Sequence, residues 1–211
     1  MCPLCNSTNI QNISGPLERG YSLCKTCRLI FVNPKYFLKP DEEKARYETH
    51  NNGPDQPGHV TFLSRALVQA EPLINHDMKI LDYGCGPVPT LSVMLKEKGY
   101  SCDDYDPFFF PNRQDKQYDA IFSTETFEHF FGPKKELDWI TKHLKANGFL
   151  IVMTEPYTDI EKFPTWYYAR DPTHVLFFHD TTMDTLAKAY GSKRLPSTDN
   201  RVFILKKLPA K

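Results

Sequence analysis

Short apolar segments alternate with amphipathic segments from residue 79 to the end of the chain. The apolar segments predict strands over Lys79–Tyr83, Tyr100–Tyr105, Asp119–Ser123, Phe149–Thr154 and Arg201–Lys206. Apolar residues at helical spacing predict helices over Pro89–Lys98, Lys134–Lys145 and Thr181–Tyr190. Strands that alternate with helices form mostly parallel sheets that helices cover on both faces. The pattern therefore predicts an α/β fold.

The segment that precedes this alternation has a different pattern. Asp41–His50 is charged and contains no helix breaker, so it predicts a surface helix. Residues 51–59 are rich in turn-forming residues and predict a loop. Apolar residues at helical spacing between Phe62 and Ala70 predict a further helix that Pro72 limits or kinks.

Four cysteines lie in two pairs near the N-terminus, Cys2 with Cys5 and Cys24 with Cys27. Two residues separate the members of each pair, and eighteen residues separate the pairs. This spacing is typical of a structural zinc site with four thiolate ligands. Two disulfides, or four unrelated cysteines, are the alternatives.

The first residues contain neither the basic nor the apolar part of a secretory signal. We therefore expect a cytoplasmic protein, in which disulfides are rare. We predict a zinc-ribbon-like module over residues 1–33, closed by a strand at Arg28–Val32, and one domain over residues 34–211. The two remaining cysteines, Cys85 and Cys102, are expected to be buried free thiols.

A glycine-containing loop, Gly84-Cys85-Gly86, connects the first strand of the α/β part to the following helix. Glycine lets the chain turn sharply and lets a ligand lie against the backbone. Asp106 ends the second strand, where a carboxylate can accept both hydroxyls of a ribose. This spacing indicates a nucleoside-type cofactor. The dinucleotide fingerprint is not met, because Pro89 stands where its third glycine would be, so a nicotinamide dehydrogenase is disfavoured.

Four segments resemble, in order, motifs of class I S-adenosylmethionine-dependent methyltransferases. They are Leu81–Gly86, Tyr105–Phe108, Tyr118–His129 and Leu144–Leu150. The resemblance covers about residues 41–208 and implies a Rossmann-like, doubly wound, mostly parallel sheet with an antiparallel final strand. It also implies S-adenosylmethionine as the cofactor. The cofactor contacts it implies are Asp82, Gly84, Cys85, Gly86, Asp106, Pro107, Phe108, Thr124 and Glu125.

The chain departs from this family pattern at two places. Val88 replaces the third glycine of the first motif. Only eleven residues lie between Asp106 and Tyr118, so we expect the family's third strand to be short or missing. Adenine recognition then needs another group, and stacking on Phe108 is one candidate.

Methyl transfer from a sulfonium needs alignment of donor and acceptor more than a strong base. The segment after Thr154 is long and aromatic, and it resembles an R-D-P-T-H-V stretch of uncharacterised methyltransferase relatives. We expect Trp166, Tyr168 and Arg170 to shape an acceptor pocket. His174 is the first candidate for a general base, and a purely structural hydrogen bond is its alternative.

Glu125, Glu128 and His129 follow the predicted strand at Asp119–Ser123. His129 is the second catalytic candidate, and capping of the loop is the alternative. Two carboxylates with a histidine also fit a metal site, but the local sequence offers too few ligands. Tyr47 and His50 are lid candidates. The remaining histidines are expected at the surface, and they are His59, His76, His143 and His179.

Composition narrows the functions. Lys and Arg number 26, as do Asp and Glu, so the net charge of zero gives no field that would attract nucleic acid. No apolar run reaches the ~18 residues of a membrane helix. We therefore expect a methyltransferase for a small molecule or a sugar. An RNA methyltransferase that docks through the ribbon is the first alternative, because residues 1–40 carry five basic side chains and one acidic. A non-catalytic adaptor is the second.

Overall fold

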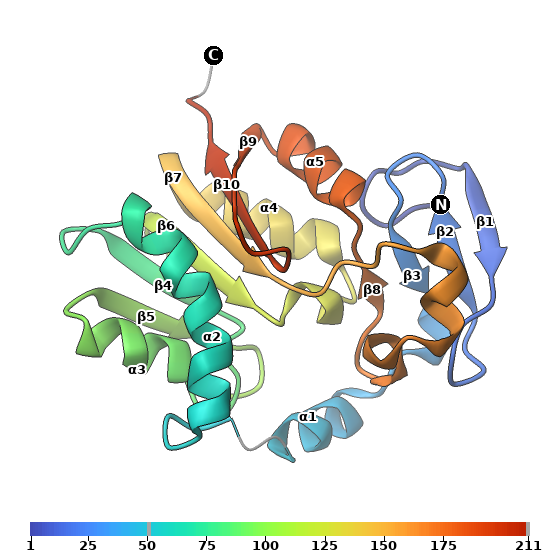
Figure 1. The fold of residues 1–211 in the computed structure, drawn as a ribbon, viewed down its shortest axis with the longest axis horizontal. Helices are drawn as coiled ribbons and strands as arrows, with labels where there is room; N and C mark the ends of the chain where they lie inside the picture. Colours follow the sequence, from blue (N-terminus) through green and yellow to red (C-terminus); the bar gives the residue numbers. More distant parts are fainter. Residues whose placement is uncertain (50–51, 210–211) are drawn as a thin grey trace.

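The computed structural model describes residues 1–49 and 52–209, and a six-stranded sheet forms its centre (Figure 1). The strand order is β5-β4-β6-β7-β10-β9. Their bounds are β4 Lys79–Tyr83, β5 Ser101–Tyr105, β6 Tyr118–Thr124, β7 Leu144–Met153, β9 Ser192–Leu195 and β10 Val202–Lys207. Strands β4 to β7 are parallel, and β10 is antiparallel to both β7 and β9. The predicted Rossmann-like α/β class with an antiparallel final strand is confirmed.

Helices cover both faces of this sheet, as the apolar patterns predicted (Figure 1). On one face, α2 and α3 pack Leu67 and Leu95 against Phe122 of β6. On the other face, α4 and α5 pack Ile140 and Leu186 into a second apolar cluster. The helix bounds are α1 Pro40–Glu48, α2 Pro57–Ala70, α3 Thr90–Glu97, α4 Pro133–His143 and α5 Asp180–Ala189. Burial of both sheet faces explains why the central strands are mostly apolar.

Strand β5 forms one edge of the sheet, and the family's third strand is missing. The described residues between β5 and β6 contain one isolated bridge, Asp106 with Phe110, and no strand. Arg113 lies in this segment and stacks its guanidinium over Tyr105, 4.4 Å from the ring centre, and over Trp139. The side chain of Arg113 thus covers the Tyr105 ring at the end of β5.

The N-terminal residues form a second sheet with the order β1-β2-β3-β8. Its strands are β1 Ile10–Ile13, β2 Tyr21–Cys24, β3 Ile30–Val32 and β8 Leu176–Phe177. Sequence analysis missed β8, a two-residue strand that comes from the C-terminal half and pairs with Ile30 and Phe31. Figure 1 shows residues 155–178, in orange, beside β1–β3. The domain boundary after residue 33 stays a prediction.

Two local predictions about α4 were wrong, and one strand was missed. His143 is buried, because it lies on the inner face of α4, stacks on Trp139 at 4.0 Å and bonds Asp115 through Nε2 at 3.0 Å. The helix predicted to Lys145 ends at His143, because β7 begins at Leu144 and contains Asn147 at φ 63°. The polar strand β9 was not predicted, because only its backbone pairing with β10 marks it.

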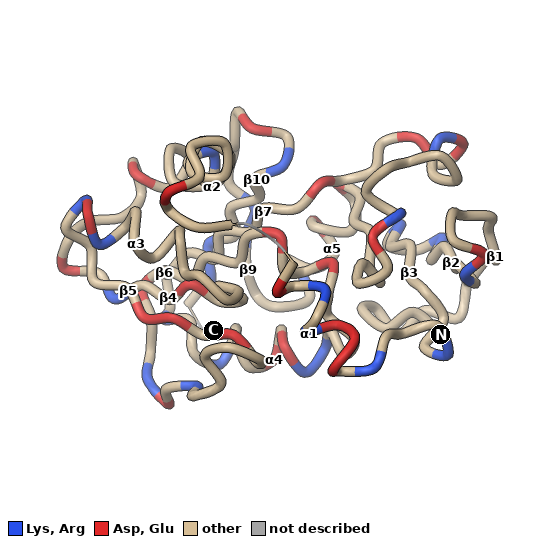
Figure 2. The backbone as a smooth tube through the Cα atoms, turned by 90° about the horizontal axis from the view of Figure 1, so that it is seen from below, with Lys and Arg blue, Asp and Glu red and all other residues tan. Residues whose placement is uncertain are grey.

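Two further features of the structure are the length of its helices and the distribution of its charged residues. Among the described residues, no helix has both the length and the hydrophobicity needed to cross a bilayer. Figure 2 shows Lys and Arg interspersed with Asp and Glu along the backbone of both sheets. A nucleic-acid interface requires a clustered basic face.

Candidate active site

A cavity of about 850 Å³ lies at the carboxyl ends of β4, β5 and β6. Ligands of open α/β sheets bind at this edge. The volume is within the range of roughly 300–1,000 Å³ typical of small-molecule and cofactor sites. All nine residues expected to contact a cofactor line it, and so do both catalytic candidates, His129 and His174.

The two glycines of the loop after β4 serve different purposes. Gly84 adopts φ 86°, and a Cβ there would lie 2.2 Å from the Thr126 side chain. Gly84 is therefore required for packing. Gly86 adopts φ 68°, and a Cβ there would meet no protein atom within 4 Å. Gly86 thus presents bare backbone to the cavity, as a cofactor-binding loop requires.

Asp106 follows β5 and organises the backbone around the cavity. Its carboxylate accepts hydrogen bonds from the N–H groups of Gly86 at 3.2 Å, Phe108 at 2.8 Å and Phe109 at 3.1 Å. Burial raises its pKa, and the three N–H donors act in the opposite direction. A carboxylate oxygen has room for more than one donor, so Asp106 can still accept from a ribose hydroxyl.

Asp82 is fully buried in β4 at the floor of the cavity, and its Oδ1 has no hydrogen-bond partner. Burial raises the pKa of Asp82 to about 8. A buried polar atom without a partner is unfavourable unless a ligand satisfies it. Burial also raises the pKa of the neighbouring Cys85 thiol, which makes Cys85 a poor nucleophile.

His129 and His174 lie side by side, with ring centres 4.7 Å apart. His129 ends the 3-10 helix η3 (Phe127–His129), and His174 precedes β8. The Nδ1 of His174 lies 2.7 Å from the carbonyl oxygen of Tyr168, and the Nδ1 of His129 lies 3.2 Å from that of Thr173. Because a carbonyl only accepts, each Nδ1 carries the proton and each Nε2 carries the lone pair.

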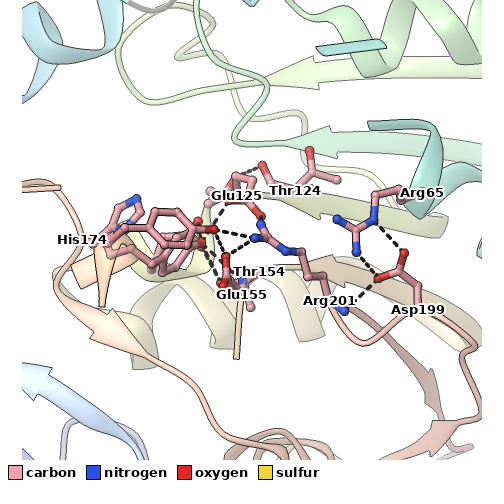
Figure 3. Close-up of polar contacts among 12 residues, drawn as sticks. Arg65, Thr124, Glu125, Thr154, Glu155, His174, Asp199 and Arg201 are labelled. Carbon is pink, nitrogen blue, oxygen red and sulfur yellow. Dashed lines mark hydrogen bonds and ion pairs between the residues drawn. The ribbon is translucent and has the colours of Figure 1, made fainter. Parts of the chain in front are cut away.

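Close to His174, one hydroxyl joins two acidic side chains, of which Glu125 is labelled in Figure 3. The Tyr168 hydroxyl bonds Glu128 and lies 3.1 Å from Glu125 and 3.2 Å from the Thr154 hydroxyl. Thr154 also donates to Glu128 at 3.0 Å. Burial raises the pKa of both glutamates, and the Glu128 carboxylate raises that of Glu125 further.

The backbone and the charges around Glu125 are unusual. Glu125 adopts φ 50°, a conformation that few residues other than glycine hold and that clusters at functional sites. Arg201 pairs with Glu155 and lies 4.0 Å from Glu125 (Figure 3). Sequence reasoning missed Thr154 and Arg201, because only the fold brings the ends of β7 and β10 to this cluster.

The predicted acceptor-pocket residues lie elsewhere. None of Trp166, Tyr168 and Arg170 lines the cavity. The Trp166 indole packs on Tyr168 and Phe177 and donates to Glu155, while Arg170 is exposed. Tyr168 contacts two residues that line the cavity, Glu125 through its hydroxyl and His174 through its carbonyl oxygen. The long segment was located correctly, but its aromatic rings fill the space between the two sheets.

The lid candidates lie on or after α1. Tyr47 lines the cavity, with its ring edge on His129 at 5.2 Å and its hydroxyl 2.7 Å from Glu43. His50 lies outside the described residues. Of the histidines expected at the surface, His76 is exposed, while His59 is half-buried and lines the cavity and His179 caps α5.

The four N-terminal cysteines converge at one point. Their sulfur atoms all lie within 4.8 Å of one another, with Cys2 to Cys27 at 3.7 Å and Cys5 to Cys24 at 3.6 Å. Thiolates at about 2.3 Å from a tetrahedral zinc ion lie about 3.8 Å apart. Disulfide sulfurs lie about 2.05 Å apart, so the arrangement fits zinc and not the disulfide alternative.

Arg19 connects the N-terminal sheet to the segment that carries His174. Its guanidinium donates to the carbonyl oxygens of four residues at 2.9–3.3 Å, and these are Ala169, Asp171, Pro172 and His174. Val175 N–H in turn donates to the Glu128 carbonyl at 2.8 Å. The position of His174 therefore depends on the sheet that the cysteines anchor.

Comparison with protein-family models gives one match, described as a methyltransferase domain, over residues 55–194. This chain belongs to that methyltransferase family. The match includes every predicted cofactor contact and both catalytic candidates, but not the four cysteines. No curated protein matches the chain.

Solved structures of methyltransferases share the fold. The 1,6-didemethyltoxoflavin-N1-methyltransferase of Burkholderia thailandensis, solved with its substrate and S-adenosylhomocysteine, has a TM-score of 0.58 at 11% identity. That match covers 94% of this chain and 100% of the other. An O-methyltransferase family protein from the same organism has a TM-score of 0.54 at 10% identity, covering 80% of this chain and 64% of the other. This chain thus shares its fold with these solved structures.

Proposed function

We propose that this protein transfers a methyl group from S-adenosylmethionine to a small-molecule acceptor. The observation that carries the proposal is the cavity itself. Bare backbone at Gly86, the carboxylate of Asp106 and the unsatisfied oxygen of Asp82 all meet there. When bound, the cofactor supplies an already activated methyl group, so the protein has to align and shield more than to activate.

The residues proposed to hold the cofactor make different kinds of contact with it. Asp106 accepts from the ribose hydroxyls, while Gly84, Cys85 and Gly86 form the backbone turn below it. The unpaired oxygen of Asp82 faces the cationic part of the cofactor, whose positive charge favours the ionised form of the Asp82 carboxyl. Pro107 and Phe108 form the apolar wall for the base, and Thr124 and Glu125 close the side nearest the acceptor.

His129 and His174 form the acceptor end of the cavity in this proposal. Their Nε2 lone pairs bind a hydroxyl proton or a cation there. Without a cation, His174 is the group that takes the acceptor's proton, because its Nδ1 is held by a backbone carbonyl. Tyr47 covers this end as part of a lid.

A small acceptor is favoured by size and by charge. A cavity of about 850 Å³ has room for a cofactor and one further small molecule. Equal numbers of basic and acidic residues argue against a nucleic-acid substrate, whose binding depends on phosphate contacts. The solved relative that binds 1,6-didemethyltoxoflavin is a small-molecule enzyme of the same fold.

The four cysteines are proposed to bind one structural zinc ion. Four thiolates leave no coordination position for substrate, so this ion has no catalytic part. Its function is to hold β1–β3 together and, through Arg19, to position the segment that ends at His174.

Replacement of Asp106 tests the cofactor proposal. The Asp106→Ala variant is expected to bind S-adenosylhomocysteine about 10–100-fold more weakly, because hydrogen bonds to a charged group contribute about 1.5–3 kcal/mol each. Isothermal titration calorimetry measures this. Asp106→Asn keeps an oxygen that accepts from Phe108 and Phe109 but removes the negative charge and the acceptor of the Gly86 N–H, so its affinity is expected to lie between those of wild type and Asp106→Ala.

The matched control for this experiment is Asp103→Ala on the same strand. Asp103 bonds Lys116 and Tyr118 and does not line the cavity, so its loss should leave cofactor affinity within about twofold. Equal affinity of Asp106→Ala and wild type would show that another acid holds the ribose.

A further inference from the structure

Three potential metal ligands meet at the acceptor end of the cavity, although the sequence places them on two separate segments. Glu128 and His129 belong to η3, and His174 lies in the loop before β8. The hydrogen bond from Val175 N–H to the Glu128 carbonyl ties the two segments together. One ligand atom from each residue lies within 4.8 Å of the other two.

The spacing of these atoms is close to that of a formed site. Ligands at about 2.1 Å from one ion are at most about 4.2 Å apart. The three groups therefore need to approach by less than about 1 Å to share an ion. Each histidine ring forms one hydrogen bond through Nδ1 to a backbone carbonyl. Small rotations of the side chains are enough to bring the three ligand atoms to these distances.

Each ligand has the supporting hydrogen bond that metal sites require. A histidine that binds a metal donates its other ring N–H to a carbonyl or carboxylate, which fixes the tautomer and the ring orientation. The carbonyl oxygens of Tyr168 and Thr173 accept these bonds from His174 and His129. The Glu128 carboxylate is likewise oriented by the hydroxyls of Tyr168 and Thr154.

Charge also favours a cation at this position. Glu125 and Glu128 both bond the Tyr168 hydroxyl, so two acidic side chains converge on one point, and Glu128 is fully buried there. The Arg201 guanidinium forms an ion pair with Glu155, and it lies 4.0 Å from the carboxylate of Glu125. A buried carboxylate pair is stabilised by an ion placed beside it.

We propose that Glu128, His129 and His174 bind one divalent transition-metal ion at the acceptor end of the cavity. Two imidazoles and one carboxylate suit zinc, iron, cobalt and nickel better than magnesium or calcium, which prefer oxygen ligands alone. This ion is separate from the zinc of the four cysteines. Three protein ligands leave positions that an exogenous molecule can fill.

This site restricts the class of acceptor, a step that rests on the proposed methyl transfer. An ion with vacant positions binds oxygen or sulfur atoms of the acceptor and lowers the pKa of a bound hydroxyl or thiol. The acceptor class is therefore a small molecule with a metal-binding hydroxyl, enolate or thiol group. With the ion present, His174 acts as its ligand and the ion takes over the activation of the acceptor.

Titration with Co²⁺ alone tests the site, with no cofactor or acceptor present. The protein is used with its cysteine site filled by zinc, which cobalt displaces poorly because it binds more weakly. Wild type is expected to bind one Co²⁺ per chain and to melt at a higher temperature in its presence. His174→Ala, His129→Ala and Glu128→Gln are each expected to weaken Co²⁺ binding at least 10–100-fold.

His76→Ala is the matched control, because His76 is exposed, stacks on Tyr100 and lies far from the three ligands in the sequence. Its affinity for Co²⁺ should equal that of wild type. No Co²⁺ binding by wild type, or unchanged binding in any ligand variant that melts cooperatively, would overturn the proposal. If one variant is unfolded, the other two decide.

A parallel titration with S-adenosylhomocysteine separates the two proposals. Binding of S-adenosylhomocysteine without Co²⁺ binding rejects the metal site and leaves the methyltransferase. Binding of Co²⁺ without S-adenosylhomocysteine keeps the metal site and rejects the cofactor assignment, together with the acceptor class that depends on it.

Discussion

The Cys24→Ser variant is expected to contain no zinc and to melt roughly 10 °C below wild type. Structural zinc binding contributes about 10–16 kcal/mol to peptides that fold only around the ion. The central sheet has an apolar cluster with none of the four cysteines in it, so we expect this sheet to stay folded and the loss to be roughly 3–5 kcal/mol, at about 2–4 °C for each kcal/mol in a chain of this size.

The loss should reach the active site as well as the N-terminal sheet. Besides the bonds of Arg19, the cysteine module is joined to the later chain by β3 with β8, by the Thr182 hydroxyl with the Cys27 carbonyl, and by Tyr157 with the Arg28 carbonyl. When β1–β3 unfold, His174 loses its support. Cofactor affinity should change little, because Gly86 and Asp106 are held by β4 and β5.

Metal analysis and differential scanning calorimetry measure these effects. Cys102→Ser is the matched control, since Cys102 is a buried thiol of β5 outside the cluster. It should keep one zinc ion per chain. Zinc retained by Cys24→Ser, or a wild-type protein that binds no zinc, would contradict the four-cysteine site.

The Arg19→Lys variant is expected to lose about 2–4 kcal/mol of stability in the segment that carries His174. A lysine keeps the charge but lacks the planar set of five N–H donors that reaches four carbonyls at once. Hydrogen bonds to charged groups contribute about 1.5–3 kcal/mol each, and lysine replaces only part of them.

Hydrogen exchange resolves this local effect. The amides of His174 and Val175 should exchange roughly 30-fold faster or more, since each 1.4 kcal/mol changes an opening equilibrium about tenfold. Affinity for S-adenosylhomocysteine should stay within twofold. Arg194→Lys is the control, because Arg194 pairs with Asp180 and Asp184 at the surface. Unchanged exchange in Arg19→Lys would mean that β8 alone holds the segment.

The sequence was sufficient for the parts of the fold that depend on local pattern. Apolar strands such as β4 and β6 are buried on both faces, so their composition alone reveals them. Gly84 and Gly86 mark a turn that other residues cannot form, and Asp106 follows from its place at the end of a strand. These features explain why nine residues that line the cavity could be selected from the sequence, while their contact with a cofactor stays a prediction.

The acceptor side could be predicted only in part. The sequence indicated His129 and His174 as separate candidates. That they lie beside Glu128 depends on the pairing of β3 with β8, and β8 is a strand of only two residues that the sequence pattern does not reveal. Thr154 and Arg201 come from strands that meet only in the folded sheet. Tyr168 was expected to line a pocket, whereas it does not line the cavity and its hydroxyl bonds two glutamates.

Titration of the wild-type protein with S-adenosylhomocysteine tests the central claim most directly, with NADH titrated in parallel. We expect saturable binding of one S-adenosylhomocysteine per chain and no binding of NADH, because the loop after β4 lacks the third glycine of the dinucleotide fingerprint. No heat of binding with S-adenosylhomocysteine, from a protein that melts cooperatively, would contradict the claim and leave an adaptor with a methyltransferase fold.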